Sequence, residues 1–134
     1  MRYEFEIKKL SGIYDLETMQ MWFSEWGMPK ANPEIFPENT YFILHKGKPV
    51  CGGSIYLTDS KVAFIESLVA DPKSDKEVRD IALDLLINNI FTIAKNKGFK
   101  FWSATTKIDE VVRRGKKFKM TQFESKNYWM TGEL

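Results

Sequence analysis

The chain has 134 residues, of which 43% are hydrophobic and 14% aromatic. This composition excludes intrinsic disorder and suffices for a buried core. The formal net charge is only +2, so the overall charge does not predict a nucleic acid partner. With one cysteine (Cys51) and one histidine, we expect no disulfide framework, no structural zinc site and a reducing, cytoplasmic location.

No apolar stretch approaches the roughly 18 residues that a membrane span requires. The first ten residues alternate apolar and charged side chains, unlike a signal peptide or an anchor. We therefore expect one domain over residues 1–134, without a membrane association, as a monomer or a homodimer.

Taken in chain order, the sequence predicts a mixed α/β order of elements from hydrophobic periodicity and turn residues. The first half contains a strand at 3–9, a short helix from Asp15 or Thr18 to Trp26, and a hairpin of strands at 41–45 and 50–57. The second half contains a strand at 62–69, a helix from about 75 to 97, a strand at 99–105, a helix at 108–114, and strands at 118–123 and 127–130.

The junction between the strand at 62–69 and the following helix carries the clearest functional signal. The first turn of a helix leaves N–H groups free at the positive end of its dipole, which suits phosphate. Glu66 interrupts the otherwise apolar strand. A carboxylate desolvated there would have a raised pKa, as a general base requires. The alternative is that strand alternation places Glu66 on a solvated or salt-bridged face.

Three motifs follow one another at these elements, namely GKPVCGGSIY at 47–56, IESLVADP at 65–72 and EVRDIA at 77–82. In their order and spacing they resemble the GNAT superfamily of acyl-CoA-dependent N-acyltransferases, over about residues 40–123. Small divergent members encoded by phages and prophages are the most similar. The resemblance implies an α/β (α+β) fold whose central sheet is mixed, mostly antiparallel and flanked by helices.

The resemblance also implies an acetyl-CoA-dependent N-acetyltransferase that acts on an amine of a small molecule or a protein. Glu66 stands 13 residues before Arg79, the spacing at which some members place their catalytic glutamate. The pantetheine and the acyl carbonyl would contact the backbone of the following run, made up of Ser67, Leu68, Val69 and Ala70.

The family's diphosphate pattern, Arg/Gln-x-x-Gly-x-Gly/Ala, aligns with residues 77–82. Ala82 fits this pattern, whereas Asp80 replaces the first glycine and Glu77 adds a negative charge. The residues that the resemblance assigns to the diphosphate are Lys76, Arg79, Asp80, Ile81 and Ala82. Ser74 and Glu77 also match a capping box, which would give both a structural role.

Two further positions differ from the family. Thr105 or Thr106 stands where an asparagine often ends the preceding strand, and we include Thr105 among the cofactor-binding candidates. Arg113 stands near the family's general-acid tyrosine, so Tyr128 is the remaining candidate for that acid. In the aromatic N-terminal helix, Trp22 and Trp26 are expected either in the core or as a wall of the acceptor cleft.

A second interpretation is a catalytically inactive GNAT-fold binding protein, for example a phage accessory or host-interacting protein. It would use the cleft or the aromatic N-terminal face to bind a macromolecular partner. The basic run at 113–119 gives a third, weaker interpretation as a nucleic acid contact. The same run could form a solvated turn or contact the adenosine 3′-phosphate of CoA. Cys51 is expected to be a small core residue.

Overall fold

The computed structural model describes residues 4–29, 32–104 and 109–118. Several predicted features lie outside these residues. They are the strand at 127–130, most of the strand at 118–123, and the candidate site residues Thr105 and Tyr128.

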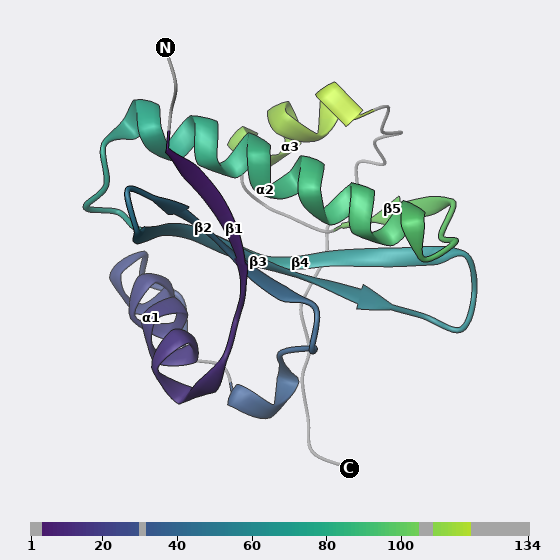
Figure 1. The fold of residues 1–134 in the computed structure, drawn as a ribbon, viewed down its shortest axis with the longest axis horizontal. Helices are drawn as coiled ribbons and strands as arrows, with labels where there is room; N and C mark the ends of the chain where they lie inside the picture. Colours follow the sequence, from purple (N-terminus) through teal and green to yellow (C-terminus); the bar gives the residue numbers. More distant parts are fainter. Residues whose placement is uncertain (1–3, 30–31, 105–108, 119–134) are drawn as a thin grey trace.

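A five-stranded sheet organises the described residues (Figure 1). Its strands are β1 (Phe5–Lys9), β2 (Thr40–His45), β3 (Lys48–Leu57), β4 (Val62–Ala70) and β5 (Phe101–Ser103). They follow one another across the sheet in the same order as along the chain. The first four strands are antiparallel, and β5 runs parallel to β4. The α-helices are α1 (Gly12–Glu25), α2 (Lys76–Asn96) and α3 (Asp109–Gly115), and the 3-10 helices are η1 (Pro33–Ile35) and η2 (Lys116–Phe118). This mixed, mostly antiparallel architecture confirms the predicted fold class.

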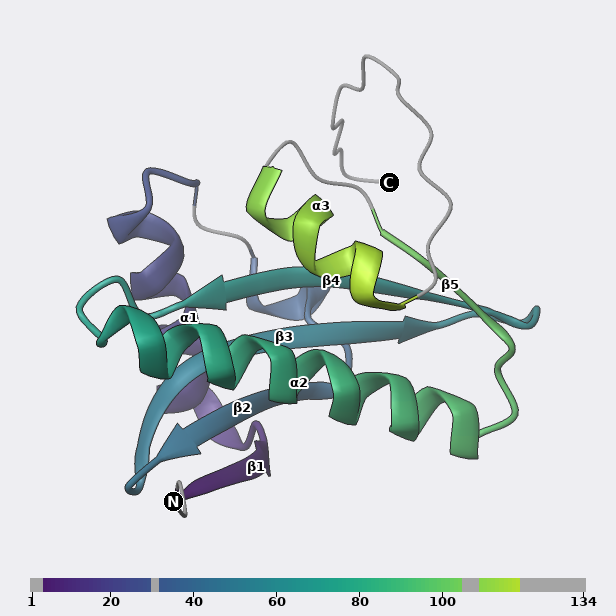
Figure 2. The same cartoon turned by 90° about the horizontal axis from the view of Figure 1, so that it is seen from above.

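The helices cover both faces of the sheet. α2 and α3 lie on one face and α1 on the other (Figures 1 and 2). The larger core lies beneath α2, where Ile55 and Ile65 of the sheet pack with Leu86 and Ile90. A second core joins α1 to the opposite face through Met19, Trp22, Phe42 and Val69. The two cores hold β3 and β4 between layers of helix.

Trp22 belongs to this second core. Its side chain is 2% exposed and its ring centroid lies 5.4 Å from that of Phe42. Core packing therefore accounts for Trp22, and its side chain is not accessible to an acceptor.

The start of α1 differs from the expectation. The helix begins at Gly12 rather than at Asp15 or Thr18. Asp15 lies inside the first turn, where its carboxylate accepts a hydrogen bond from the backbone N–H of Ser11 at 2.9 Å. The helix ends at Glu25, with Trp26 as its C-cap, one residue before the predicted end. Gly27 stops it as expected, because it adopts a positive φ of 77° and Met28 N donates back to Phe23 O at 2.8 Å.

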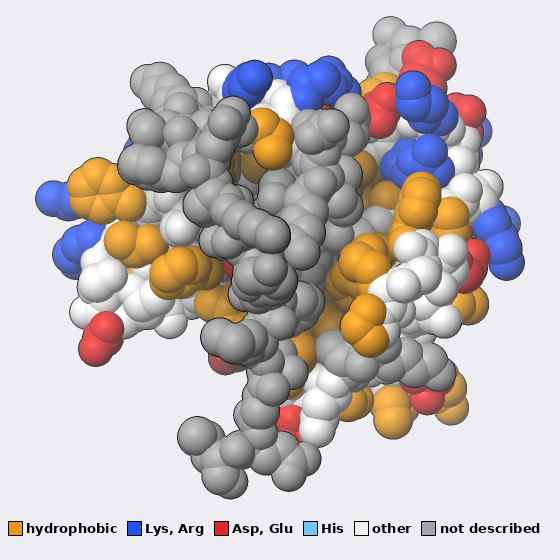
Figure 3. All heavy atoms as spheres, turned by 180° about the vertical axis from the view of Figure 1, so that it is seen from behind, with side chains coloured by type: hydrophobic (Ala, Val, Ile, Leu, Met, Phe, Trp, Pro, Cys, Tyr) orange, Lys and Arg blue, Asp and Glu red, His pale blue; other side chains and the backbone are white. Residues whose placement is uncertain are grey.

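The surface of the described residues is partly apolar, and hydrophobic side chains reach it on the face seen in Figure 3. Near and along α1, the exposed large side chains are Ile13, Tyr14, Met21 and Trp26, of which Tyr14 is 80% exposed. None of the described helices combines the length and apolar character needed to cross a membrane.

Candidate active site

Among the described residues, the side of β4 that faces away from β3 is only partly covered, by the short strand β5; we call it the open side of β4. The two strands form only three residue pairs, from Val62–Phe101 to Phe64–Ser103. β4 continues to Ala70, so its residues 65–70 extend beyond the described part of β5. Backbone groups on that side of β4 therefore point away from any described strand, as the predicted acyl-CoA contact requires.

A β-bulge interrupts β4 within this stretch. Gly52 pairs with Val69 and Ser54 pairs with Glu66, so Gly53 alone faces the two residues Ser67 and Leu68. Ser67 has a φ of +60°, a left-handed conformation that costs a non-glycine residue roughly 1–2 kcal/mol. Bulges bend a strand and re-aim its side chains, and they are frequent beside active sites.

Gly53 makes room for this bulge. A Cβ atom built on Gly53 would lie 2.5 Å from Cδ2 of Leu68 and 3.3 Å from Cδ2 of Leu86. Any larger residue would push Leu68 out of the position that it takes in the bulge. Gly53, the second of the two adjacent glycines in the motif at 47–56, therefore has a packing role in the geometry of β4.

Glu66 stands directly before the bulge. Ile65 packs beneath α2, and alternation along the strand places Glu66 on the opposite face of the sheet. Glu66 is half-buried and pairs across the ladder with Ser54, whose hydroxyl forms a buried hydrogen bond with that of Thr40 at 2.8 Å. The carboxylate is thus neither deeply buried nor fully solvated, which lies between the two sequence-based expectations.

Tyr56 lies on the same face and was missed by the sequence analysis. Its hydroxyl donates to the carbonyl oxygen of Ile35 at 2.8 Å, which holds η1 against β3. Burial raises the pKa of Tyr56, and the negative charge of Glu66 adds to this rise, although a hydrogen bond with Ser67 acts against it. The alternation of β3 could have indicated this residue, because Tyr56 follows Ser54 by two positions.

The far end of β4 meets Trp26. Asp71 N donates to Val50 O at 2.8 Å, so the antiparallel pattern points the N–H and C=O groups of Ala70 away from β3. The indole Nε1 of Trp26 donates to the carbonyl oxygen of Ala70 at 2.7 Å. The Trp26 indole is therefore hydrogen-bonded to the carbonyl oxygen of Ala70, one of the backbone groups that the resemblance assigned to the pantetheine.

The N-terminus of α2 does not form the predicted capping box. The helix begins at Lys76, and in the described part of the chain the N-cap residue Asp75 makes no side-chain cap hydrogen bond. The Ser74 hydroxyl instead donates to the carbonyl oxygen of Asp71 at 2.6 Å. Glu77 is exposed in the first turn. Neither Ser74 nor Asp75 therefore caps the N–H groups of this turn with its side chain.

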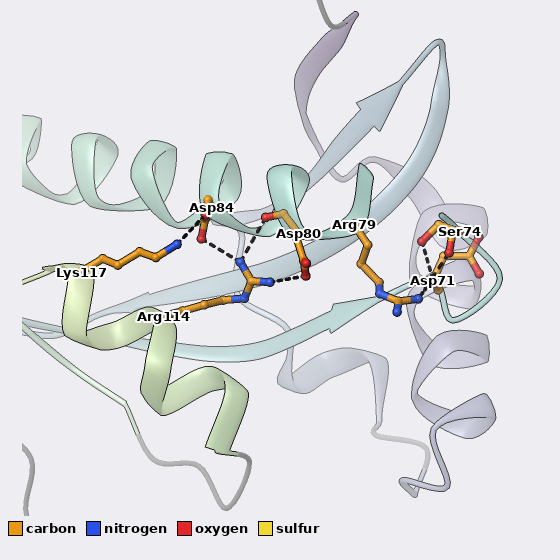
Figure 4. Close-up of polar contacts among 7 residues, drawn as sticks. All are labelled: Asp71, Ser74, Arg79, Asp80, Asp84, Arg114 and Lys117. Atoms are coloured by element: carbon orange, nitrogen blue, oxygen red, sulfur yellow. Dashed lines mark hydrogen bonds and ion pairs between the residues drawn. The ribbon is translucent and has the colours of Figure 1, made fainter. Parts of the chain in front are cut away.

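Arg79 turns toward the loop before the helix rather than toward open solvent (Figure 4). Its Nη1 lies 3.5, 3.3 and 3.4 Å from the carbonyl oxygens of Asp71, Pro72 and Ser74. These contacts are long for hydrogen bonds to a guanidinium group. Lys76 is exposed, Ile81 is half-buried and Ala82 is buried in the core. Arg79 and Lys76 are thus the cations at this end of α2 that an anion could recruit.

Asp80 has a different partner. Arg114 of α3 donates to the Asp80 carboxylate at 2.6 Å, to the Asp80 carbonyl oxygen at 3.1 Å and to Asp84 at 2.7 Å (Figure 4). Lys117 also contacts Asp84, at 3.0 Å. The Arg114 side chain is only 4% exposed. We name Arg114, Asp80, Asp84 and Lys117 the helix clasp, because they join α3 and η2 to α2.

The helix clasp changes two expectations. Asp80, assigned by the resemblance to the diphosphate, is engaged in an ion pair within the protein. Two cations of the basic run at 113–119, Arg114 and Lys117, point toward α2 rather than toward a partner. The run is therefore a poor basis for the nucleic acid interpretation.

The chain is similar to known proteins in its three-dimensional structure rather than in its sequence. No protein-family model matches the chain, and no significant match is found among curated proteins. Solved structures do match. Ribosomal-protein-S18-alanine N-acetyltransferase from Escherichia coli has a TM-score of 0.72 at 12% identity, over 95% of this chain and 84% of that one.

An aminoglycoside acetyltransferase from an uncultured soil metagenomic sample gives a TM-score of 0.71 at 16% identity, over 96% of this chain and 97% of that one. N-acetylglutamate synthase from Neisseria gonorrhoeae, complexed with coenzyme A, gives 0.66 at 14% identity, over 86% of this chain and 28% of that one. At such low identities the likeness shows the fold alone. The chain has the GNAT fold of these acetyltransferases.

Proposed function

We propose that the protein is an N-acetyltransferase that transfers an acetyl group from acetyl-CoA to an amine acceptor. The observation that carries this proposal is the bulge of β4 beside a half-buried Glu66, at the point where β4 extends beyond β5. The acetyltransferase names of the structural neighbours support it, as does the coenzyme A bound to N-acetylglutamate synthase.

In the proposed reaction, open backbone groups of residues 67–70 hold the pantetheine and orient the thioester. Glu66 accepts the proton of the amine as its nitrogen attacks the thioester carbon. The new C–N bond forms, the C–S bond breaks and CoA leaves as a thiolate. Tyr128 stays the proposed acid for that thiolate, and Thr105 a proposed cofactor contact, although both lie outside the described residues. Tyr56 could orient η1 beside the acceptor.

The diphosphate of CoA would lie at the first turn of α2. The N-cap residue Asp75 leaves the N–H groups of this turn without a side-chain cap, and Lys76 and Arg79 supply positive charge. Ile81 and Ala82 would contribute only packing, because they lie beyond the first turn of α2 and their N–H groups are used within the helix. Asp80 drops out of this set, because the helix clasp uses its carboxylate.

The decisive experiment compares the wild-type protein with Glu66→Gln. Free thiol release from acetyl-CoA is followed with an aminoglycoside, glucosamine 6-phosphate and a peptide with an N-terminal alanine. Acetyl-CoA should raise the melting temperature of both proteins equally, since only binding to the native state matters. Turnover should fall about 10²- to 10⁴-fold in Glu66→Gln. Glu6→Gln, on the exposed edge strand β1, is the matched control and should keep full turnover.

Equal turnover in Glu66→Gln and wild type would refute the proposed base. An absence of any melting shift at millimolar acetyl-CoA would refute the acyltransferase itself. The second candidate, a binding protein without catalysis, would then be favoured. It draws its support from the exposed side chains of Ile13, Tyr14 and Met21 on α1, and from the Trp26 indole at Ala70. Phage origin and the phage accessory role stay predictions from sequence.

A further inference from the structure

Three contacts join the end of α1 to β4, to α2 and to the loop between them. The Trp26 indole donates to Ala70 O at 2.7 Å. The Arg79 guanidinium carbon lies 5.8 Å from the centre of a Trp26 ring, within the range of a cation–π contact. Glu25 and Lys73 form a long ion pair of 3.8 Å. Trp26 takes part in the first two of these contacts, the hydrogen bond and the cation–π contact.

We propose that Trp26 gates the acyl-donor site, so that the donor binds by displacing the Trp26 indole from the carbonyl oxygen of Ala70. This inference rests on the proposed acyl-CoA activity, because the displacing group is an amide N–H of the pantetheine. One N–H···O hydrogen bond at Ala70 is lost and one is gained. The exchange is therefore nearly balanced, and a small difference in free energy decides whether the gate is open.

The geometry allows Trp26 to leave at low cost. The side chain is 49% exposed, so a rotation into solvent leaves no cavity in either core. Trp26 is the C-cap residue of α1 and is followed by Gly27 at a positive φ. The helix itself, held by Met19 and Trp22 in the second core, need not move.

Arg79 links the gate to the phosphate end of the donor. Its contacts with the loop carbonyl groups measure 3.3–3.5 Å, and a diphosphate would offer it shorter, charge-assisted hydrogen bonds. A guanidinium that turns toward the diphosphate leaves the ring of Trp26. The pantetheine amide would thus replace the indole at the carbonyl oxygen of Ala70, and the diphosphate would draw Arg79 away from the Trp26 ring.

The test replaces Trp26 by phenylalanine, which keeps an aromatic ring and removes the indole N–H. Titration calorimetry with acetyl-CoA should give a Kd about three- to tenfold lower for Trp26→Phe than for wild type, since the competing hydrogen bond is gone. Binding should also change the tryptophan fluorescence of the wild type, and this component should be absent from Trp26→Phe.

Trp22→Phe is the matched control, because it makes the same substitution on the buried side of α1. It should leave the Kd and the fluorescence change as in wild type. A merely structural role of Trp26 would weaken binding and lower the melting temperature together, whereas a gate gives tighter binding at equal or lower stability.

Equal or weaker binding by Trp26→Phe, with clear binding by wild type, would overturn the gate and leave the proposed function intact. An absence of binding by both proteins would overturn both proposals. Binding by Trp26→Phe alone would support the gate most strongly.

Discussion

Removal of the Arg114 side chain should destabilise the protein more than any other single change at the charged residues that the structure describes. Arg114→Met keeps the length and the apolar stem but leaves Asp80 and Asp84 without their main cation. These carboxylates lie one turn apart on α2, where like charges repel. Lys117→Met is the matched control, because Lys117 is 50% exposed and contacts only Asp84 in the helix clasp.

The expected size follows from burial. Loss of one partner from a fully buried ion pair costs about 3–5 kcal/mol. The Asp80 and Asp84 side chains are 41% and 33% exposed, so water screens the two charges that Arg114→Met leaves behind. We therefore expect a loss of about 2–3 kcal/mol. For a domain of this size that loss lowers the melting temperature by roughly 6–12 °C. Lys117→Met should cost about 0–1 kcal/mol.

Urea unfolding followed by far-ultraviolet circular dichroism gives both free energies, and equal m-values would show that the unfolded states are comparable. Asp80→Asn and Asp84→Asn, added to Arg114→Met, should recover part of the loss because they remove the repulsion. A loss for Arg114→Met no larger than that for Lys117→Met would refute the reasoning, since burial of the guanidinium would then carry no weight.

Two further predictions concern β3. Gly53→Ala should lower the free energy of unfolding by about 1 kcal/mol, because its Cβ would meet Cδ2 of Leu68 at 2.5 Å and the flexible end of that side chain would have to turn aside; an unchanged urea midpoint would contradict a packed bulge. Burial raises the pKa of Cys51 to about 12, so iodoacetamide should alkylate the native thiol far more slowly than the urea-unfolded one. Between pH 9 and 12 only the unfolded thiol ionises, so the Cys51 contribution to stability should decline as pH rises. Alkylation as fast in the native state would be inconsistent with this burial.

The order of elements could be predicted because each one has a local signal. The alternation at β1, the glycine at the end of α1 and the turn around Gly47 all depend on neighbours in the chain. The turn illustrates this, since Lys46 and Gly47 both adopt a positive φ of 51° and 78° and join β2 to β3. Glu66 as a candidate base also came from a local signal, a charge within an apolar run.

The features that decide the site depend on residues far apart in the sequence. The bulge requires Gly53 opposite Ser67 and Leu68, a matter of register between strands. Trp26 and Ala70 are 44 residues apart, and Asp80 and Arg114 are 34 apart. From the sequence, Asp80 in place of the family's glycine indicated only a lost phosphate contact. Its ion-pair partner Arg114, on α3, could not be identified from the sequence.

The capping box failed for another reason. Its local pattern, Ser74 with Glu77, is present, but a side-chain hydroxyl can also bond to a nearby carbonyl group. Ser74 takes that alternative with Asp71. Sequence alone does not decide between two local hydrogen bonds of similar strength.

Amide hydrogen exchange with and without acetyl-CoA tests the central claim most directly, that the open side of β4 is an acyl-CoA site. The N–H of Ala70 points away from β3, so a bound pantetheine should slow the exchange of residues 67–70. The amides of β1, on the far edge of the sheet, should exchange as before. Unchanged exchange at residues 67–70 under saturating acetyl-CoA would contradict the account.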